Sequence, residues 1–206
     1  MKKYLAALST TALICVAPHA LAASSTDLTV TGSITPGACT PALSSGGIVD
    51  YGKISAKDLD PVKDTWLSRQ PLQLTVSCEA STRFALQSLD NKAGTATNDE
   101  YFGIGLTPAN EKIGMLDVSI NSTLADAQQA QAIGSKDGGA TWKKQNYIDP
   151  LSLSSVAAAS DHSTPIPVKD LAMELQVAVG IAGANSLTLT DEVSLEGSVT
   201  IQVKYL

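Results

Sequence analysis

The chain has 206 residues, a formal net charge of −6, 44% hydrophobic residues and 4% aromatic residues. Its only arginines are Arg69 and Arg83, and it has no basic cluster. Such a chain repels a phosphate backbone, so we expect no nucleic acid partner. The length suits a single domain, and no apolar run reaches the length of a membrane-spanning helix.

The first 22 residues have the composition of a secretory signal peptide. Lys2 and Lys3 give a positively charged start, and residues 4–20 are mostly apolar. Ala20 and Ala22 place small residues at the two positions that a signal peptidase reads. We therefore predict cleavage after Ala22 and export of the mature chain through the periplasm or a similar secretory compartment.

The mature chain then begins with a strand-like segment, residues 25–39, which reads STDLTVTGSITPGAC. Leu28, Val30 and Ile34 alternate with polar residues, and Gly32 stands where a further apolar side chain is expected. One interpretation is the first strand of the protein's own sheet, with the glycine at a bulge or a close backbone approach. The other is a strand offered to a neighbouring molecule.

Two cysteines remain after removal of the signal peptide, Cys39 and Cys78. In an oxidising compartment an isolated pair is most simply a disulfide, which would stabilise the fold by about 4 kcal/mol in the chain-entropy model. Free thiols or a metal site are the alternatives. A metal needs more ligands than the single mature histidine, His162, provides. We expect neither a metal nor a cofactor.

Short segments with strand-like alternation, separated by turn residues, follow along the chain. They cover residues 47–54, 71–78, 82–89, 101–106, 115–120, 170–181 and 196–206. This succession predicts an all-β fold, a β-sandwich.

Two segments interrupt this pattern. Residues 122–134, STLADAQQAQAIG, are rich in alanine and glutamine, and Leu124, Ala127 and Ala130 have helical spacing. We expect a small insertion there, either a short helix or a loop. Residues 154–160 are small and polar, and we expect a loop.

Residues 135–142, SKDGGATW, fit the S-x-D-x-G-x-T-W pattern of an Asp-box, which occurs in sialidase propellers and other secreted β-proteins. The pattern residues are Ser135, Asp137, Gly139, Thr141 and Trp142. A sialidase-like site requires a cluster of arginines for the substrate carboxylate, and a propeller requires repeated blades. The chain offers neither, so we interpret the motif as a structural hairpin turn. No other catalytic arrangement is present in the sequence, and we expect no enzyme activity.

The C-terminal segment SVTIQVKYL alternates throughout its length. Val199, Ile201, Val203 and Tyr205 lie on one face of the predicted strand, and Tyr205 is the penultimate residue.

Three stretches together resemble a chaperone–usher pilin, the immunoglobulin-like subunit of bacterial fimbriae. They are the N-terminal alternation with a glycine seven positions before Cys39, IVDYGKI at 48–54, and the C-terminal strand with its penultimate tyrosine. The ends are similar to type 1 pilus subunits. The middle is more similar to the pilin-like family of unknown function associated with β-fimbriae.

The resemblance implies an incomplete immunoglobulin-like sandwich over residues 38–206 and a donor-strand extension over residues 23–37. The C-terminal strand would border an open groove, an aggregation hazard until it is covered. A periplasmic chaperone would cover it first, and after passage through an outer-membrane usher the donor strand of a neighbouring subunit would replace the chaperone. Leu28, Val30 and Ile34 would enter this groove, with Gly32 at a shallow point.

The resemblance thus implies a structural fimbrial subunit on the bacterial surface, with any host receptor unknown. A self-complete secreted sandwich that binds carbohydrate or protein is the first alternative. A glycosidase built around the Asp-box is the second.

Overall fold

The computed structural model describes residues 28–31 and 38–206. The chain divides into two units, Met1–Ile34 and Thr35–Leu206. The predicted signal peptide, Gly32 and Ile34 lie outside the described residues. In the first unit, residues 28–31 carry no assigned strand, and Leu28 and Val30 are exposed.

The second unit is built from β-strands. They are β1 (Cys39–Leu43), β2 (Thr65–Trp66), β3 (Gln70–Thr82), β4 (Phe84–Asp90), β5 (Gly114–Ala125), β6 (Gln128–Ser135), β7 (Lys143–Lys144), β8 (Tyr147–Ile148), β9 (Leu153–Ala158), β10 (Val168–Ile181) and β11 (Val199–Tyr205). Three short 3₁₀ turns, η1 (Ser44–Gly47), η2 (Ala56–Asp58) and η3 (Ala184–Ser186), connect some of them. The described residues contain no α-helix, so the predicted all-β class is confirmed.

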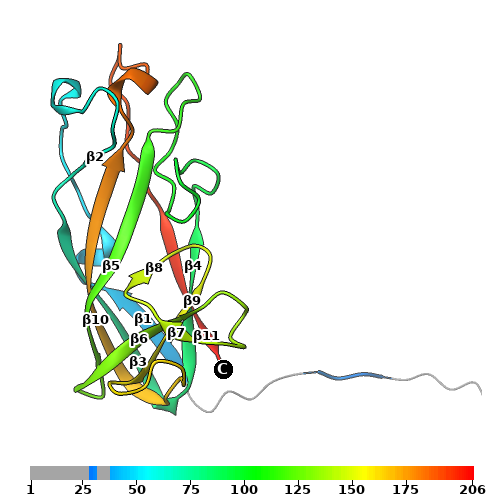
Figure 1. The fold of residues 1–206 in the computed structure, drawn as a ribbon. Coiled ribbons are helices and arrows are strands. Elements are labelled where there is room, and N and C mark those ends of the chain that lie inside the picture. The colour runs from blue at the N-terminus through cyan, green and yellow to red at the C-terminus, as the bar shows by residue number, and fades with distance from the viewer. Residues whose placement is uncertain (1–27, 32–37) are drawn as a thin grey trace, which may run out of the picture. The chain divides into compact units, whose positions relative to one another are not determined.

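Eight strands form an antiparallel, nearly closed, barrel-like sheet in the order β1-β3-β10-β5-β6-β9-β4-β11 (Figure 1). Strand β6 makes the turn between the two halves, because its start pairs with β5 and the rest pairs with β9. The short strands β2, β7 and β8 pair with β10, β6 and β5. The strand order therefore begins at β1 and ends at β11, and these two strands face each other across the remaining opening.

The apolar residues alternate along the strands and meet in the interior. In β3, for example, Leu74, Val76 and Cys78 are buried, whereas Gln73 and Ser77 are exposed. The largest buried cluster also takes Phe84 and Leu86 from β4. A second cluster around Ile104, Ile113 and Ile181 fills the other end of the domain. Burial of an apolar side chain stabilises the fold by about 1.5–3 kcal/mol, so these clusters supply the main driving force.

The predicted disulfide is confirmed. Cys39 and Cys78 are bonded, and they are directly opposite each other in the register of β1 and β3, with a Cα–Cα distance of 3.9 Å. The bond fastens β1, an edge strand, to the interior strand beside it.

The expected helical or loop insertion at 122–134 is wrong. These residues form the end of β5, a two-residue turn at Asp126 and Ala127, and β6. The turn is fixed by the rest of the sheet: the Asp126 carboxylate accepts hydrogen bonds from the backbone N–H groups of Lys169 and Asp170 at 3.0 and 2.8 Å. Pairing with distant strands outweighs the local helical spacing of the alanines.

Three further strand assignments differ from expectation. Residues 154–160 are mostly strand, because β9 lies between β4 and β6 and its small side chains fit there; Ala157 is fully buried. Residues 101–106 form only isolated bridges, such as Phe102 with Leu116. Residues 48–54 carry no strand assignment although their sequence alternates.

Candidate functional site

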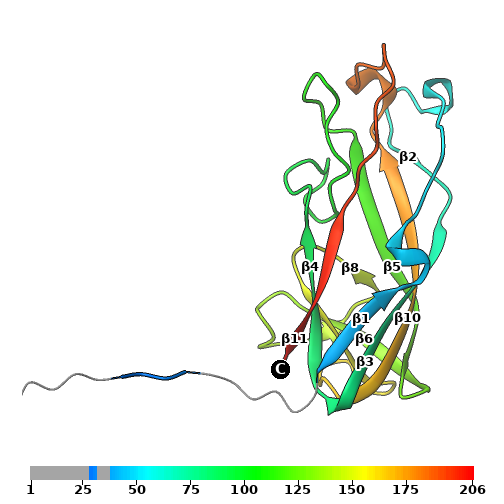
Figure 2. The ribbon, with the colours of Figure 1, turned by 180° about the vertical axis from the view of Figure 1, so that it is seen from behind.

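The opening between β1 and β11 is the candidate site. At one end the two strands touch, since the Cys39 backbone N–H donates to the Tyr205 hydroxyl at 3.0 Å. Farther along, the chain after β1 and the chain before β11 diverge, and Figure 2 shows β5 and β10 behind them.

A groove of about 620 Å³ occupies this opening. One rim is the segment 49–54, and the other is the segment 189–201, which includes the first part of β11. The floor comes from the sheet strands β5 and β10 and from the loop residues between β4 and β5. Its apolar floor residues are Phe102, Ile104, Ile113, Leu116, Val118, Leu175, Val177, Val179 and Ile181.

The rim of β11 has unpaired backbone groups. Among the described strands β11 pairs with β4 alone, and the bonds Asn91 N–H to Ser198 O and Leu206 N–H to Arg83 O fix which residues face β4. Because hydrogen-bonded pairs alternate in an antiparallel ladder, Val199, Ile201 and Val203 direct their N–H and C=O groups away from β4. Their side chains remain half-buried against the core. The edge therefore offers both hydrogen bonds and an apolar surface.

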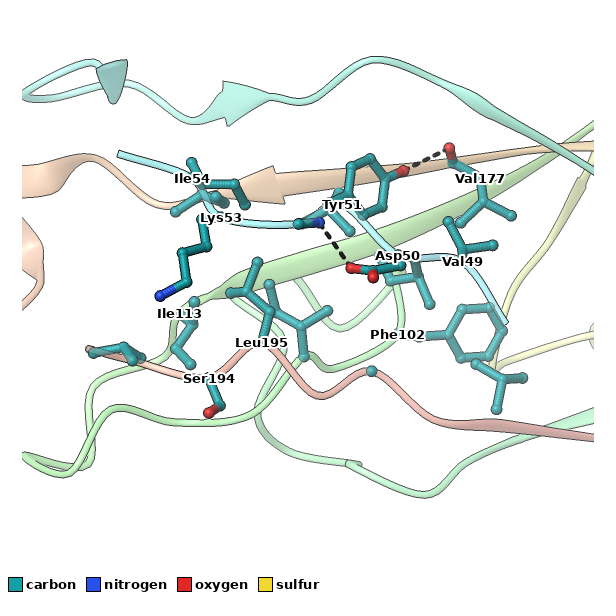
Figure 3. A pocket seen from close by; sticks show the side chains of 18 of the residues that line it. Val49, Asp50, Tyr51, Lys53, Ile54, Phe102, Ile113, Val177, Ser194 and Leu195 are labelled. Atoms are coloured by element: carbon teal, nitrogen blue, oxygen red, sulfur yellow. Dashed lines mark hydrogen bonds between the residues drawn. The ribbon is translucent and has the colours of Figure 1, made fainter. Parts of the chain in front are cut away.

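The opposite rim is held in place by one side chain. The Tyr51 hydroxyl donates to the Val177 carbonyl at 2.9 Å, and Figure 3 shows the ring laid across β10. Partial burial raises the pKa of Tyr51 above its ordinary value, so this donor stays protonated at neutral pH. No backbone-to-backbone hydrogen bond joins residues 49–54 to another described residue. This rim turns at Gly52, whose N–H donates to the Asp50 carboxylate at 2.8 Å, and its other backbone N–H groups have no hydrogen-bond partner among the described residues.

The mouth of the groove is polar. Asp50, Lys53, Asp191 and Glu192 belong to its lining, and Lys53 Nζ lies 3.5 Å from Glu192 Oε2. That ion pair joins the two rims, but both side chains are more than four-fifths exposed. Exposed pairs of this kind contribute about 0–1 kcal/mol, so the bridge does not hold the groove shut.

The Asp-box residues lie outside the groove and form the connection between β6 and β7. The Asp137 carboxylate accepts hydrogen bonds from the Thr141 hydroxyl, the Thr141 backbone N–H and the Ser135 hydroxyl. These bonds, the Thr141 hydroxyl first, hold the pKa of Asp137 well below its usual range. The Trp142 indole N–H donates to the Gly139 carbonyl at 3.0 Å, and the indole itself is buried. Every one of these groups is engaged inside the turn.

The structure brings Val199 and Ile201 into the groove, whereas Val203 packs on the core and Tyr205 bonds to β1 beyond the groove's end. Of the predicted donor residues, Leu28 and Val30 are described and are 90% and 85% exposed. Sequence reasoning missed the rim residues Leu189, Val193 and Leu195. With Leu187 they occupy alternate positions of LTLTDEVSL, but the charged pair Asp191–Glu192 interrupts the apolar alternation and concealed this signal.

Within residues 28–31 and 38–206, no helix has the length and apolar character needed to cross a membrane.

Comparison with known proteins places the chain in a defined group. A family described as "Protein of unknown function (DUF1120)" matches residues 28–136. "Protein GltF" of Escherichia coli (strain K12) is 30% identical over 247 aligned residues, which cover 96% of this chain and 97% of that protein. "Uncharacterized protein YhcF" of the same strain is 27% identical over 229 residues, which cover 92% of this chain and 94% of that protein.

Proposed function

We propose that this chain, which belongs to the DUF1120 family, is a structural subunit of a bacterial surface fimbria. It would polymerise by donor-strand complementation, in which a strand from a neighbouring subunit fills the groove between the segment 49–54 and β11. In this proposal the sheet is an immunoglobulin-like sandwich that lacks one strand of its own.

The observation that carries the proposal is that an apolar groove and an unpaired strand edge lie side by side. The groove has an apolar floor and half-buried apolar rims, and it runs beside the free backbone groups of Val199 and Ile201. A small-molecule pocket needs the first feature but not the second. An added β-strand needs both, because its backbone bonds the edge while alternate side chains enter the floor.

The N-terminal segment of the chain has the matching pattern. Leu28, Val30 and Ile34 would present three apolar side chains at two- and four-residue spacing, with Gly32 between them. Burial of each would stabilise the complex by about 1.5–3 kcal/mol, and main-chain hydrogen bonds would add to this. Ordering of the donor segment offsets part of the gain.

Such a groove has to be covered before a neighbour arrives, because an apolar edge strand with free backbone groups is prone to aggregation. We propose that a periplasmic chaperone covers it after export, and that an outer-membrane usher hands the subunit to the growing fimbria. The site residues therefore belong to an assembly surface, and the proposal assigns no catalytic role to them.

A self-complete secreted sandwich remains the competing function. In that case the mature chain would be a stable monomer whose groove takes a ligand other than a strand. The Asp-box glycosidase has no support in the geometry, because each polar group of the motif is engaged in its own turn.

The decisive experiment adds a peptide of residues 24–37 to the mature domain that lacks residues 23–36. At about 1,000 times the dissociation constant, one bound peptide stabilises the domain by about 4 kcal/mol, which raises Tm by about 8–16 °C for a chain of this size. The control peptide carries Leu28→Asp and Val30→Asp. An unchanged Tm with the native peptide, or an equal rise with both peptides, would refute the proposal.

A further inference from the structure

A second cavity, on the outer face of the sheet, has the chemistry of a ligand site and takes no part in the proposed assembly. It has a volume of about 360 Å³ and lies over β5 and β8, which pair side by side on the face seen in Figure 1. Its lining residues are Arg69, Glu100, Tyr101, Asp117, Ser119, Lys136, Asn146, Tyr147, Ile148 and Asp149. The volume is at the lower end of the range for small-molecule sites, which suits one small ring.

The register of the sheet explains why these residues meet. Asp117 and Ser119 are alternate residues of β5, so their side chains share one face. Tyr147 of β8 is directly opposite Ser119, and Arg69 reaches over from the chain between β2 and β3. Arg69 donates to the Asp117 carboxylate at 3.0 Å and to the Ser119 hydroxyl. The polar base of the cavity is thus preorganised.

Asp149 is the observation that points to a ligand. This carboxylate lines the cavity, yet the residue is only 4% exposed. Its Oδ1 accepts bonds from Leu151 N–H, Ser152 N–H and the Ser152 hydroxyl, while its Oδ2 has no hydrogen-bond partner among the described residues. Oδ2 is therefore the free acceptor of a largely buried carboxylate, and a hydroxyl group in the cavity would bond to it in place of water.

The charge balance selects against an anion. Arg69 and Lys136 face three carboxylates, those of Glu100, Asp117 and Asp149, and Arg69 is already paired with Asp117. A ligand bearing a carboxylate, sulfate or phosphate would meet an excess of negative charge. Closely spaced donors and acceptors instead match groups that can donate and accept at once, as hydroxyls do.

Aromatic rings complete the site. Tyr101 and Tyr147 line the cavity, and Trp66 packs against Tyr101 with a ring centroid separation of 6.1 Å. Trp66 is 46% exposed although it is the largest side chain on this face. The C–H face of a pyranose ring carries partial positive charge and packs on the negative face of such rings.

We propose that this cavity binds a neutral saccharide, one pyranose ring deep. Its hydroxyls bond to Asp149 Oδ2, to the Arg69–Asp117 pair and to Asn146, and its C–H face lies against Tyr101 or Tyr147. The site shares only Ile148 with the lining of the groove, so a fimbrial subunit would present it on its outer surface while the groove is occupied.

The test titrates the full mature protein with the methyl glycosides of glucose, galactose, mannose, fucose and N-acetylglucosamine, followed by calorimetry and saturation-transfer NMR. At least one should bind with a dissociation constant of about 1 mM or tighter. Asp149→Asn and Asn146→Ala should each weaken that binding at least about tenfold. The matched control is Asp161→Asn, which removes a carboxylate from an exposed turn elsewhere and should leave the binding unchanged.

Several results would overturn the proposal. These are no binding by any neutral glycoside, binding only by methyl sialoside, glucuronate or glycine, or equal binding by all variants. Since Asp149→Asn can perturb its loop, the folding of each variant is checked by circular dichroism melting. If Asp149→Asn does not fold, the proposal is judged on glycoside binding by Asn146→Ala, which changes an exposed residue. Stabilisation by the peptide of residues 24–37 should be unchanged in both, which separates failure of this site from failure of the groove.

Discussion

The barrel-like sheet has a closed side at β6 and an open side between its edge strands β1 and β11. On one side, β6 pairs first with β5 and then with β9, and Ile133 and Ala157, both at most 1% exposed, are buried with Trp142 in a separate apolar cluster. On the other side, β1 and β11 touch only near Cys39 and Tyr205, and a groove of about 620 Å³ separates their continuations.

The difference shows that the open edge is a specific feature and not a sign of weak strand-forming sequence. The rim residues Val199 and Ile201 are apolar and β-branched like the buried Ile133, yet they stay half-buried. Residues 49–54 alternate like a strand but form no backbone-to-backbone hydrogen bond with another described residue. The missing strand of the proposed incomplete sandwich would explain both observations.

The largest expected effect comes from removing the disulfide that fastens the open edge. With a sequence separation of 39 between the cysteines, replacing both Cys39 and Cys78 by serine should lower the free energy of unfolding by about 4 kcal/mol. Urea denaturation measures this loss. Since β1 leads into one rim of the groove, stabilisation by the donor peptide should also decrease. A peptide effect equal to that of the wild type would show that the rim does not depend on this bond.

A pair of cavity-creating substitutions compares the two sides of the sheet directly. Ile133→Ala, on the closed side at β6, should lower the free energy of unfolding by about 2–5 kcal/mol whether or not the peptide is present. Ile201→Ala, on the groove rim, should cost less in the free domain because that side chain is only half-buried. Its cost should grow once the peptide covers it. Denaturation with and without peptide measures the loss of unfolding free energy in each variant. If the peptide changes this loss equally in both variants, the distinction between the closed and open sides is wrong.

The fold was predictable wherever one face of a strand decides the pattern. Residues 71–78, 170–181 and 196–206 alternate clearly, and β3, β10 and β11 contain almost all of these residues. The paired cysteines were predictable from compartment chemistry. The hairpin of β5 and β6 was not, because its turn depends on the backbone N–H groups of Lys169 and Asp170, more than 40 residues away.

The candidate site was predictable in part for the same reason. The edge strand with Val199 and Ile201 stands out in the sequence, whereas Tyr51 becomes a rim residue only through its bond to Val177. The second cavity was hidden altogether. Arg69, Asp117 and Asp149 are separated by dozens of residues, and only the register of β5 and β8 brings them together.

A substitution in the proposed donor segment tests whether this segment fits the groove. We predict that Gly32→Leu slows or blocks subunit pairing, because a leucine side chain at the shallow point of the groove should overfill it at a cost of about 1–3 kcal/mol. Fibre formation by the mature chain, followed by light scattering and electron microscopy, measures the effect. Thr31→Leu places the same side chain on the polar face of the segment and should have a smaller effect. Assembly of the Gly32 variant at the wild-type rate would contradict the donor assignment.

The smallest expected effect concerns the Asp-box turn, on the closed side of the sheet at β6. Because hydrogen bonds lower the pKa of Asp137 in the folded state, its carboxylate stabilises the fold above the ordinary aspartate pKa of about 3.9, and this contribution is lost as the pH falls toward the folded pKa. Asp137→Asn cannot make this contribution at any pH. The Tm of the variant should therefore lie below that of the wild type at pH 6, and the gap should narrow between about pH 4 and pH 2. Asp64→Asn, at an exposed carboxylate, is the control and should run parallel to the wild type. The Tm difference should also be the same with and without donor peptide, because the turn lies outside the groove. A Tm difference that widens on peptide binding would show that the turn and the groove are coupled.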